Sequence, residues 1–286
     1  MRLTPSAVLA RAGRAVGRPR ADEAAPAGTD ILDAYVRVAP SPQVAVDVFA
    51  GEWSSVLPGQ LGVDAGHVPL FADPRISWLL DQVEDVDGYD VLELGPLEGG
   101  HTFQLTAAGA KVTAVEANTR AYLKCLVTKE LLGMTDCRFL LGDFGAFLAE
   151  NPDERYDLVV ASGVLYHSND PLRLLEQIAR AGDRLALWTH YYDAAVIEAN
   201  PTHARHFAAE PRTVTHGGRE IRLHRRDYLE SLQSNGFCGG PEVHALWMER
   251  DDLLDALRRV GYTDVRVGGD DPDHVNGPSI LLYAER

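Results

Sequence analysis

The sequence predicts an α/β fold built on a doubly wound, mostly parallel sheet of seven strands with helices on both faces. Two observations carry this prediction. From residue 88 onward, short apolar runs alternate with segments of helical periodicity, an order that requires crossover connections between parallel strands. The first apolar run also ends in a glycine-rich turn, and an acidic residue closes the next run, which is typical of the carboxyl edge of such a sheet.

The expected elements follow one another in a regular order. The strands are short and apolar, and the helices between them carry apolar residues along one face. A helix is expected to begin at Pro171, with Asn169 or Asp170 as its cap. Strands are expected at residues 90–94, 111–115, 137–141, 156–161, 184–189, 263–267 and 279–284. Helices are expected at residues 77–83, 98–108, 119–132, 144–149, 171–181 and 249–260.

The remaining segments surround this alternation. Residues 1–30 are predicted to be a flexible N-terminal arm, because the first twenty residues hold five arginines and no acid. Residues 31–87 are expected to form a helical and loop extension before a domain at residues 88–286. Residues 191–247 interrupt the alternation with five histidines and no strong period. Segments this long without periodicity are usually functional, so we expect a lid inserted after the fifth strand.

Composition excludes several classes of protein. The 286 residues are 45% hydrophobic and 24% charged, which suits a globular chain rather than a disordered one. No apolar run is long enough for a transmembrane helix, so no membrane association is expected. The net charge of −15 argues against a large nucleic-acid footprint and favours a small or neutral substrate. Three sparsely spaced cysteines suggest a reducing compartment, so we expect a cytoplasmic monomer or homodimer.

The glycine-rich turn and the acid that follows suggest an adenosine-containing ligand. Glu116 ends the second strand 21 residues after Gly95, where doubly wound folds place an acid against ribose hydroxyls. Leu97 stands at the second glycine of the dinucleotide pattern, and Glu98 would face the phosphates, which argues against NAD and FAD. S-adenosylmethionine has no phosphate, and its positive groups suit a carboxylate such as Glu93. The alternative is an ordinary tight turn of an α/β sheet.

Four ordered motifs then carry a family resemblance: ELGPLEGG, VEAN, GDF and ASGVLYHSNDP. Together they resemble the class I S-adenosylmethionine-dependent methyltransferases, with a departure at Leu97 from the more common glycine. The resemblance covers residues 88–286 and implies a Rossmann-like fold with S-adenosylmethionine as cofactor. It implies that Glu116 binds the ribose, that Asp143 meets the adenine amino group and that Phe144 packs on the adenine ring. The residues expected to bind the cofactor are Trp53, Glu93, Gly95, Pro96, Leu97, Gly99, His101, Thr102, Glu116, Ala117, Asn118, Gly142, Asp143, Phe144, Ser162 and Gly163.

Three residues are candidates for catalysis. An alcohol acceptor gains from a general base, and histidine is the usual choice near neutral pH. His167 follows the fourth strand, at the edge where ligands bind; it acts as that base, or it orders the loop and touches the cofactor. His190 ends the fifth strand and either orients the acceptor or has a structural role. Glu52 either orients His167 or binds a sugar hydroxyl, whereas the loop around Trp53 contacts a ligand or anchors the N-terminal segment.

Aromatic side chains near the same edge suggest the acceptor, because their faces suit sugar rings. The sequence therefore favours an O-methyltransferase acting on a small molecule or saccharide. Two alternatives stay open, a tRNA-modifying enzyme of the wobble-uridine type and a catalytically silent cofactor-binding module. An NAD-dependent reductase is disfavoured by the missing glycine and the lack of a Tyr-x-x-x-Lys pair. The residues expected to bind the acceptor are Tyr166, Tyr191, Tyr192 and Trp247.

Metal binding is the last question that the sequence raises. His203 and His206 have a spacing that permits two ligands on one helical face, but no cysteine or acid pair completes an evident site. A solvated lid is the preferred interpretation of these histidines. A Mg²⁺ site built from scattered carboxylates, as some sugar O-methyltransferases use, stays open as an alternative.

Overall fold

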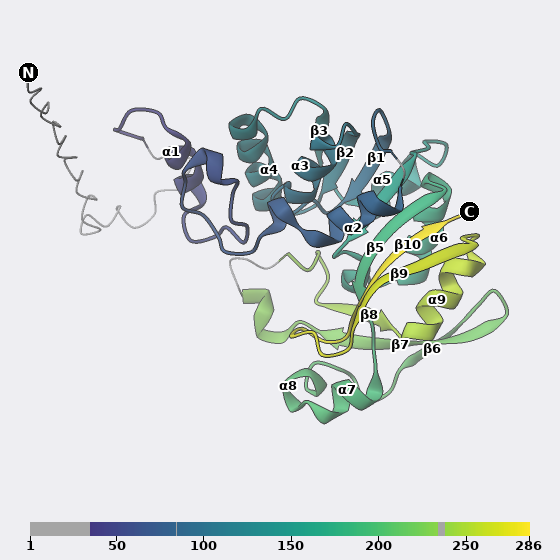
Figure 1. Ribbon diagram of the computed structural model, residues 1–286. Coiled ribbons are helices and arrows are strands. Elements are labelled where there is room, and N and C mark those ends of the chain that lie inside the picture. Colours follow the sequence, from purple (N-terminus) through teal and green to yellow (C-terminus); the bar gives the residue numbers. More distant parts are fainter. Residues whose placement is uncertain (1–34, 84, 234–237) are drawn as a thin grey trace, which may run out of the picture. The chain divides into compact units, whose positions relative to one another are not determined.

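The computed structural model describes residues 35–83, 85–233 and 238–286 (Figure 1). Residues 40–286 form one compact unit, and the described residues before them belong to a separate N-terminal unit. The predicted arm at residues 1–30 lies outside the described residues. Within the described ranges, no helix combines the length and the apolar character that crossing a bilayer would need.

A seven-stranded sheet forms the centre of the compact unit, as predicted. Its strand order is β3-β2-β1-β4-β5-β10-β9. β1 pairs in parallel with both β2 and β4, so the order reverses between β1 and β4. β10 runs antiparallel to its two neighbours, β5 and β9. The strands are β1 (Asp90–Leu94), β2 (Lys111–Glu116), β3 (Cys137–Leu141), β4 (Leu158–Ser162), β5 (Arg184–His190), β9 (Asp264–Asp271) and β10 (Ser279–Glu285).

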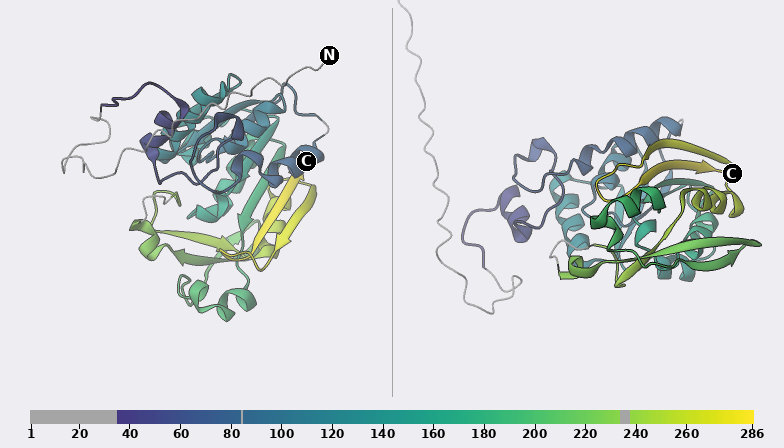
Figure 2. Two further views of the ribbon diagram at one scale, coloured as in Figure 1. Left: turned by 60° about the vertical axis from the view of Figure 1, so that its left-hand side comes forward. Right: turned by 90° about the horizontal axis from the view of Figure 1, so that it is seen from below.

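Helices cover both faces of this sheet (Figures 1 and 2). Successive strand residues point to opposite faces, so Val91 of β1 packs with one group of helices and Leu92 with the other. The first group is α2 (Pro74–Gln82), α3 (Gly100–Ala107) and α4 (Thr119–Leu132). The second group is α5 (Phe144–Glu150), α6 (Pro171–Ala181) and α9 (Arg250–Arg259).

Side-chain caps begin several helices directly after the strands. Asp170, not Asn169, caps α6, accepting a hydrogen bond from the Arg173 amide at 3.2 Å. Asn118 caps α4 and Asp143 caps α5 in the same way. Such caps satisfy amide groups that have no partner inside the helix. They also bring polar side chains to the carboxyl edge of the sheet.

A buried glutamate fastens the N-terminal segment to the sheet domain. This segment holds α1 (Pro42–Val46) and the short helices η2 (Asp47–Phe49), η3 (Gly59–Leu61) and η4 (Leu70–Ala72). The Glu98 carboxylate, fully buried, accepts hydrogen bonds from the amides of Ser54 and Ser55 at 2.9 and 2.7 Å. Lys124 Nζ donates to the same carboxylate at 2.9 Å. Glu98 therefore neutralises a buried cation and satisfies a loop backbone at once.

The insertion after β5 contains regular structure that its sequence pattern does not predict. It forms a three-stranded antiparallel sheet, β6-β7-β8. The prediction missed it because β7 alternates charged residues with only two apolar core residues, Ile221 and Leu223. Leu246 of β8 donates to the Ser168 carbonyl at 2.9 Å, which joins this sheet to the loop after β4. The elements are α7 (Ala194–Ala199), α8 (Pro201–Ala204), β6 (Arg212–His216), β7 (Arg219–Asp227), η6 (Leu229–Gln233) and β8 (His244–Met248).

Replacing Glu98 tests its role as an anchor. We expect Glu98→Ala to lower the free energy of unfolding by about 3 kcal/mol, because it leaves the Lys124 ammonium buried without its carboxylate. Glu52→Ala is the matched control, since Glu52 pairs with the exposed Arg120 and its loss should cost less than about 1 kcal/mol. Urea denaturation of the two variants measures both values. Equal losses would contradict the assignment.

Candidate active site

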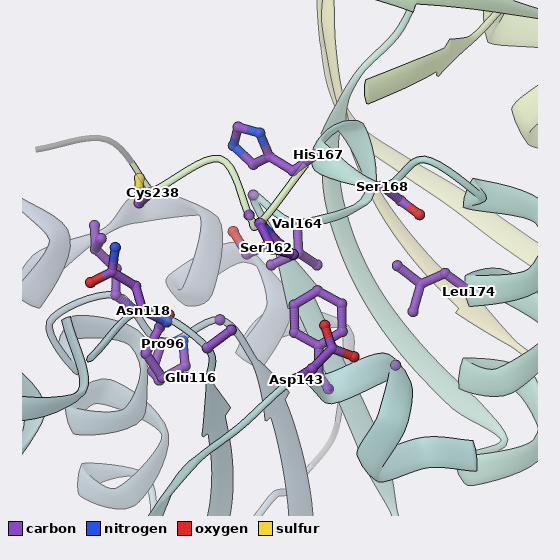
Figure 3. Close-up of a pocket in the computed structure, with 18 of the residues that line it drawn as sticks. Pro96, Glu116, Asn118, Asp143, Ser162, Val164, His167, Ser168, Leu174 and Cys238 are labelled. Carbon is purple, nitrogen blue, oxygen red and sulfur yellow. Dashed lines mark hydrogen bonds between the residues drawn. The ribbon is translucent and has the colours of Figure 1, made fainter. Parts of the chain in front are cut away.

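A cavity of about 1040 Å³ opens at the carboxyl edge of the sheet, where the strand order reverses (Figure 3). Open α/β sheets bind their ligands at this position. The loops after β1, β2, β3 and β4 form most of its wall. Cys238 and residues 240–242 of the insertion complete the wall. A single cavity is therefore lined by both the sheet and the insertion.

The loop after β1 adopts the conformation that its glycines allow. Gly95 has a φ of +67°, and a Cβ there would lie 2.6 Å from Val164 Cγ1, so a larger residue does not fit. Leu97 also has a positive φ, of 55°, which is strained for a residue with a side chain. Leu97 thus takes the left-handed backbone that a glycine would take at this point.

Glu116 connects this loop to the loop after β2. Its carboxylate accepts hydrogen bonds from the amides of Leu97 at 3.1 Å and of Asn118 at 2.7 Å. Burial raises the pKa of Glu116, and these backbone hydrogen bonds oppose the rise. Glu116, Ala117 and Asn118 all line the cavity, together with Gly95, Pro96 and Leu97. The carboxylate predicted to bind a ribose is therefore held rigidly at the cavity wall.

Four residues predicted to bind the cofactor do not line the cavity. Glu93 and Thr102 are buried and bond to each other through Oε2 and Oγ1, and burial raises the pKa of Glu93. Gly99 has a φ of +82° at the start of α3, where a Cβ would lie 3.2 Å from Phe139. Trp53 is packed in an apolar cluster, and its indole donates to the Val46 carbonyl at 2.8 Å. All four support the loops rather than the cavity surface.

Glu98 also lies away from the cavity. The prediction that Glu98 would face a phosphate is wrong, because its carboxylate is held by Ser54, Ser55 and Lys124. The argument against NAD and FAD that rests on its charge therefore has no structural basis. The error arises because spacing gives the position of a side chain in the loop but not the direction in which it points.

The loops after β3 and β4 supply the other side of the cavity. Gly142, Asp143 and Phe144 line it, as do Ser162 and Gly163. Asp143 Oδ1 accepts from the Ala146 amide at 2.7 Å, which fixes the carboxylate at the start of α5. The hydroxyl oxygen of Ser162 is buried and has no hydrogen-bond partner in the described structure. A polar ligand in the cavity would satisfy it.

An ionic cluster that the sequence does not predict borders the cavity. His101 Nε2 lies 2.8 Å from Asp73 Oδ2, and Arg75 pairs with the same carboxylate. Burial opposes ionisation of Asp73, but the hydrogen bonds from His101 and Arg75 lower its pKa below the ordinary range. The Arg75 guanidinium also lies 4.4 Å from the centre of the Trp188 ring. His101, Arg75 and Trp188 all line the cavity, so this cluster places the Arg75 guanidinium, paired with Asp73, at the cavity wall.

His167 lies in a short helical turn after β4 and lines the cavity (Figure 3). Its Nδ1 is 2.7 Å from the Tyr228 hydroxyl, which the insertion supplies just after β7. Burial, the charge of Arg226 and the neighbouring His190 lower the pKa of His167 to about 3. The imidazole is therefore neutral near pH 7. Glu52, the predicted partner of His167, instead pairs with Arg120 at 2.9 Å and does not line the cavity.

His190 belongs to an aromatic cluster beside the cavity. Its ring stacks on Trp247 with centroids 5.1 Å apart and meets Tyr166 edge-on at 4.6 Å. Its Nδ1 donates to the carbonyl of Gly277 at 2.8 Å, and burial lowers the pKa of His190 to about 4. His190 is not a lining residue, whereas Tyr166 is. Trp247 donates to the Tyr166 carbonyl at 3.0 Å, so the cluster supports the position of Tyr166.

The other predicted acceptor residues are directed elsewhere. Tyr191 is buried in the main core, and its hydroxyl donates to Asp270 at 2.8 Å. Tyr192 stacks on His224 with centroids 3.5 Å apart. Neither tyrosine lines the cavity, nor does Trp247. Tyr191 and Tyr192 are consecutive residues, so their side chains point to different sides of the chain. The prediction that both bind the acceptor did not take this into account.

His203 and His206, whose spacing would permit metal binding, belong to no metal-binding group of the described residues. His206 Nδ1 donates to the Asp227 carbonyl at 2.9 Å. Within residues 35–83, 85–233 and 238–286, no group of three or more histidine, cysteine or acidic side chains has the geometry to hold a metal ion. All three cysteines are free, and Cys125 and Cys137 are buried.

Comparison with known proteins agrees with this geometry. Residues 92–183 match a family model described as a methyltransferase domain. A tRNA U34 carboxymethyltransferase of Campylobacter hominis is 29% identical over 128 residues, which are 40% of this chain. The match spans only 41% of the length of that relative.

Solved structures share the fold. The N-terminal domain of EvdMO1, solved in the presence of S-adenosylhomocysteine and D-fucose, aligns with a TM-score of 0.64 and 20% identity over 85% of this chain and 94% of that one. Magnesium protoporphyrin IX methyltransferase from Synechocystis PCC 6803 with bound S-adenosylmethionine aligns with a TM-score of 0.52 and 15% identity over 88% and 100% of the two chains. Residues 92–183 therefore match a methyltransferase domain, and the strand order and these solved structures show that the chain has the fold of S-adenosylmethionine-dependent methyltransferases.

Proposed function

We propose that the protein transfers the methyl group of S-adenosylmethionine to a hydroxyl of a small molecule or saccharide, with His167 as the general base. The observation that carries the proposal is the position of His167. It is a neutral imidazole on the cavity wall, with one ring nitrogen engaged by Tyr228 at 2.7 Å. A base in this state can accept a proton from an alcohol.

The cavity residues fit the cofactor. The Glu116 carboxylate suits the two ribose hydroxyls, and Phe144 offers an apolar ring beside Asp143 for the adenine. The unpaired hydroxyl of Ser162 offers a polar contact within the same cavity. A volume of about 1040 Å³ lies at the upper end of ordinary ligand sites, which leaves room for an acceptor. The bound cofactor supplies an already activated methyl group.

The work left to the protein is to position the acceptor and remove its proton. We assign the proton on Nδ1 of His167 to a hydrogen bond with the Tyr228 oxygen. Nε2 is then the nitrogen that takes the hydroxyl proton as the oxygen attacks. The Tyr166 and Trp188 rings line the same cavity and suit the apolar face of a sugar.

We further propose that residues 191–247 act as a lid over the acceptor. Cys238 and residues 240–242 line the cavity, and Tyr228 contacts His167. A lid made in this way would exclude water from the transfer. The free cysteines favour a reducing compartment, so we propose a cytoplasmic location. A monomer or homodimer is a separate proposal for the oligomeric state of the protein.

Two comparisons bear on the acceptor. The EvdMO1 domain was solved with D-fucose, which supports a saccharide, whereas the Campylobacter relative supports a modified tRNA. The net charge of −15 favours the small acceptor, since a tRNA phosphate backbone would meet a strongly acidic protein.

An acceptor panel separates these functions. Purified protein is incubated with radiolabelled S-adenosylmethionine and with free sugars, nucleotide sugars, hydroxylated aromatic compounds or unmodified tRNA. We expect label on a hydroxyl of a small acceptor. Label on tRNA alone would favour the second function, and S-adenosylhomocysteine binding without transfer to any acceptor would favour a silent module.

Glu116→Gln tests the cofactor site. A hydrogen bond to a charged group contributes about 1.5–3 kcal/mol, so the variant should bind S-adenosylhomocysteine at least about tenfold more weakly. Glu150→Gln is the control, since Glu150 is exposed at the end of the cavity-lining helix α5. Isothermal titration calorimetry measures both affinities. Unchanged affinity in Glu116→Gln would remove this residue from the site.

His167→Gln tests the base. General-base catalysis contributes about 10²- to 10⁴-fold, so kcat should fall by that factor while S-adenosylhomocysteine still binds. His216→Gln serves as control, because His216 pairs with Glu176 and does not line the cavity. Equal loss of kcat and of cofactor affinity in His167→Gln would instead indicate that His167 only supports the cofactor pocket.

The pH dependence of kcat/KM gives an independent test. A base must be unprotonated, and the pKa of His167 is lowered from about 6.5 to about 3 by burial and nearby positive charge. Activity should therefore be lost only as pH falls toward 3, and kcat/KM should stay level between about pH 5 and 8. A fall centred near pH 6.5 that His167→Gln abolishes would mean that His167 is not held neutral by its surroundings.

A further inference from the structure

Arg226 differs from every other arginine in the described part of the chain. The others either pair with a carboxylate or are exposed to solvent. Arg226, at the end of β7, is partly buried and pairs with no carboxylate of the described residues. A cation taken partly out of water without a counter-ion is costly. Among the described residues, the Arg226 guanidinium therefore has aromatic rings as neighbours but no carboxylate as a counter-ion.

The charge lies close to the proposed base. The Arg226 guanidinium is 5.3 Å from the centre of the Trp247 ring and 5.7 Å from that of Tyr228. The Tyr228 hydroxyl is in turn 2.7 Å from His167 Nδ1. A single tyrosine ring thus separates the guanidinium from the catalytic imidazole.

The positive charge of Arg226 affects the pKa values of neighbouring side chains. Arg226 is among the causes that lower the pKa of His167 and of His190, after burial itself. Burial also lowers the pKa of Arg226, and only Tyr228 and Tyr166 are found to oppose this effect. An anion beside the guanidinium would relieve all of these interactions. Arg226 does not line the main cavity, so that anion would lie on the insertion side of His167 rather than in the cofactor pocket.

We propose that Arg226 binds an anionic group, a carboxylate or a phosphate, carried by the methyl acceptor. The planar guanidinium presents a fork of donors that matches either group. The acceptor would then be an acidic sugar or a sugar phosphate. Its hydroxyl would reach His167 while its carboxylate or phosphate binds the Arg226 guanidinium. This inference rests on the proposed function, and it narrows the small-acceptor class to members with a localised negative charge.

The test measures binding to the full chain saturated with S-adenosylhomocysteine. Calorimetric titrations with D-glucuronate, D-glucose 6-phosphate and D-glucose compare a carboxylate, a phosphate and a neutral sugar. At least one anionic sugar should bind about tenfold or more tightly than glucose, and Arg226→Gln should remove that preference. The anionic sugar that binds more tightly identifies the group.

Two further variants keep the result interpretable. Arg222 lies on the same strand as Arg226 but is exposed and paired with Glu249. The preference for the anionic sugar should therefore persist in Arg222→Gln. Arg226→Lys keeps the charge without the fork and should retain part of the preference. No preference in the wild-type protein, or an equal preference in Arg226→Gln, would overturn the proposal, as would equal loss in Arg222→Gln.

Failure of this proposal is distinguishable from failure of the proposed function. Affinity for S-adenosylhomocysteine reports the cofactor site in each variant, and the radiolabel panel reports transfer to a hydroxyl. Transfer to neutral sugars with no effect of Arg226→Gln would contradict the anion site alone. Anion binding with no transfer to any hydroxyl would contradict the proposed function and leave Arg226 as a ligand-binding residue.

Discussion

Buried polar groups at the carboxyl edge of the sheet must find partners, and the site depends on how they do so. The Glu116 carboxylate accepts hydrogen bonds from the amides of Leu97 and Asn118, which fixes the loops after β1 and β2 against each other. In the same loop after β1, the Glu98 carboxylate accepts hydrogen bonds from the amides of Ser54 and Ser55 and from the Lys124 ammonium. Because an unpaired buried group costs about 1–3 kcal/mol, these contacts hold the loops in place before any ligand binds.

The insertion completes the site under the same constraint. His167 is partly buried and forms a hydrogen bond with Tyr228, which is 61 residues away in the chain. The contact brings the insertion sheet to the loop after β4, and the hydrogen bond from Leu246 to Ser168 fastens it there. In the proposed function, catalysis and acceptor recognition therefore depend on different segments. The sheet would supply the loops that bind the cofactor and His167, and the insertion would supply Tyr228 and Arg226.

Local order made the sheet and most of the loops that line the cavity predictable. The strands are short buried runs, and caps such as Asp170 are visible in the sequence. Contacts across long stretches of chain were not predictable. Glu98 was expected to face the phosphates of a dinucleotide but binds a loop 43 residues earlier. Glu52 was expected either to orient His167 or to bind a sugar hydroxyl, but it pairs with Arg120. Strands β6 and β7 of the insertion were missed because few of their residues are apolar and buried.

The tautomer of His167 tests the central claim most directly, namely that the insertion prepares this imidazole to accept a proton. Nitrogen NMR of ¹⁵N-histidine-labelled protein with bound S-adenosylhomocysteine at pH 7 distinguishes the two ring nitrogens, and Tyr228→Phe identifies the hydrogen bond. The account predicts a neutral ring with the proton on Nδ1 and an unprotonated Nε2. A doubly protonated ring, or a neutral ring with its proton on Nε2, would contradict it.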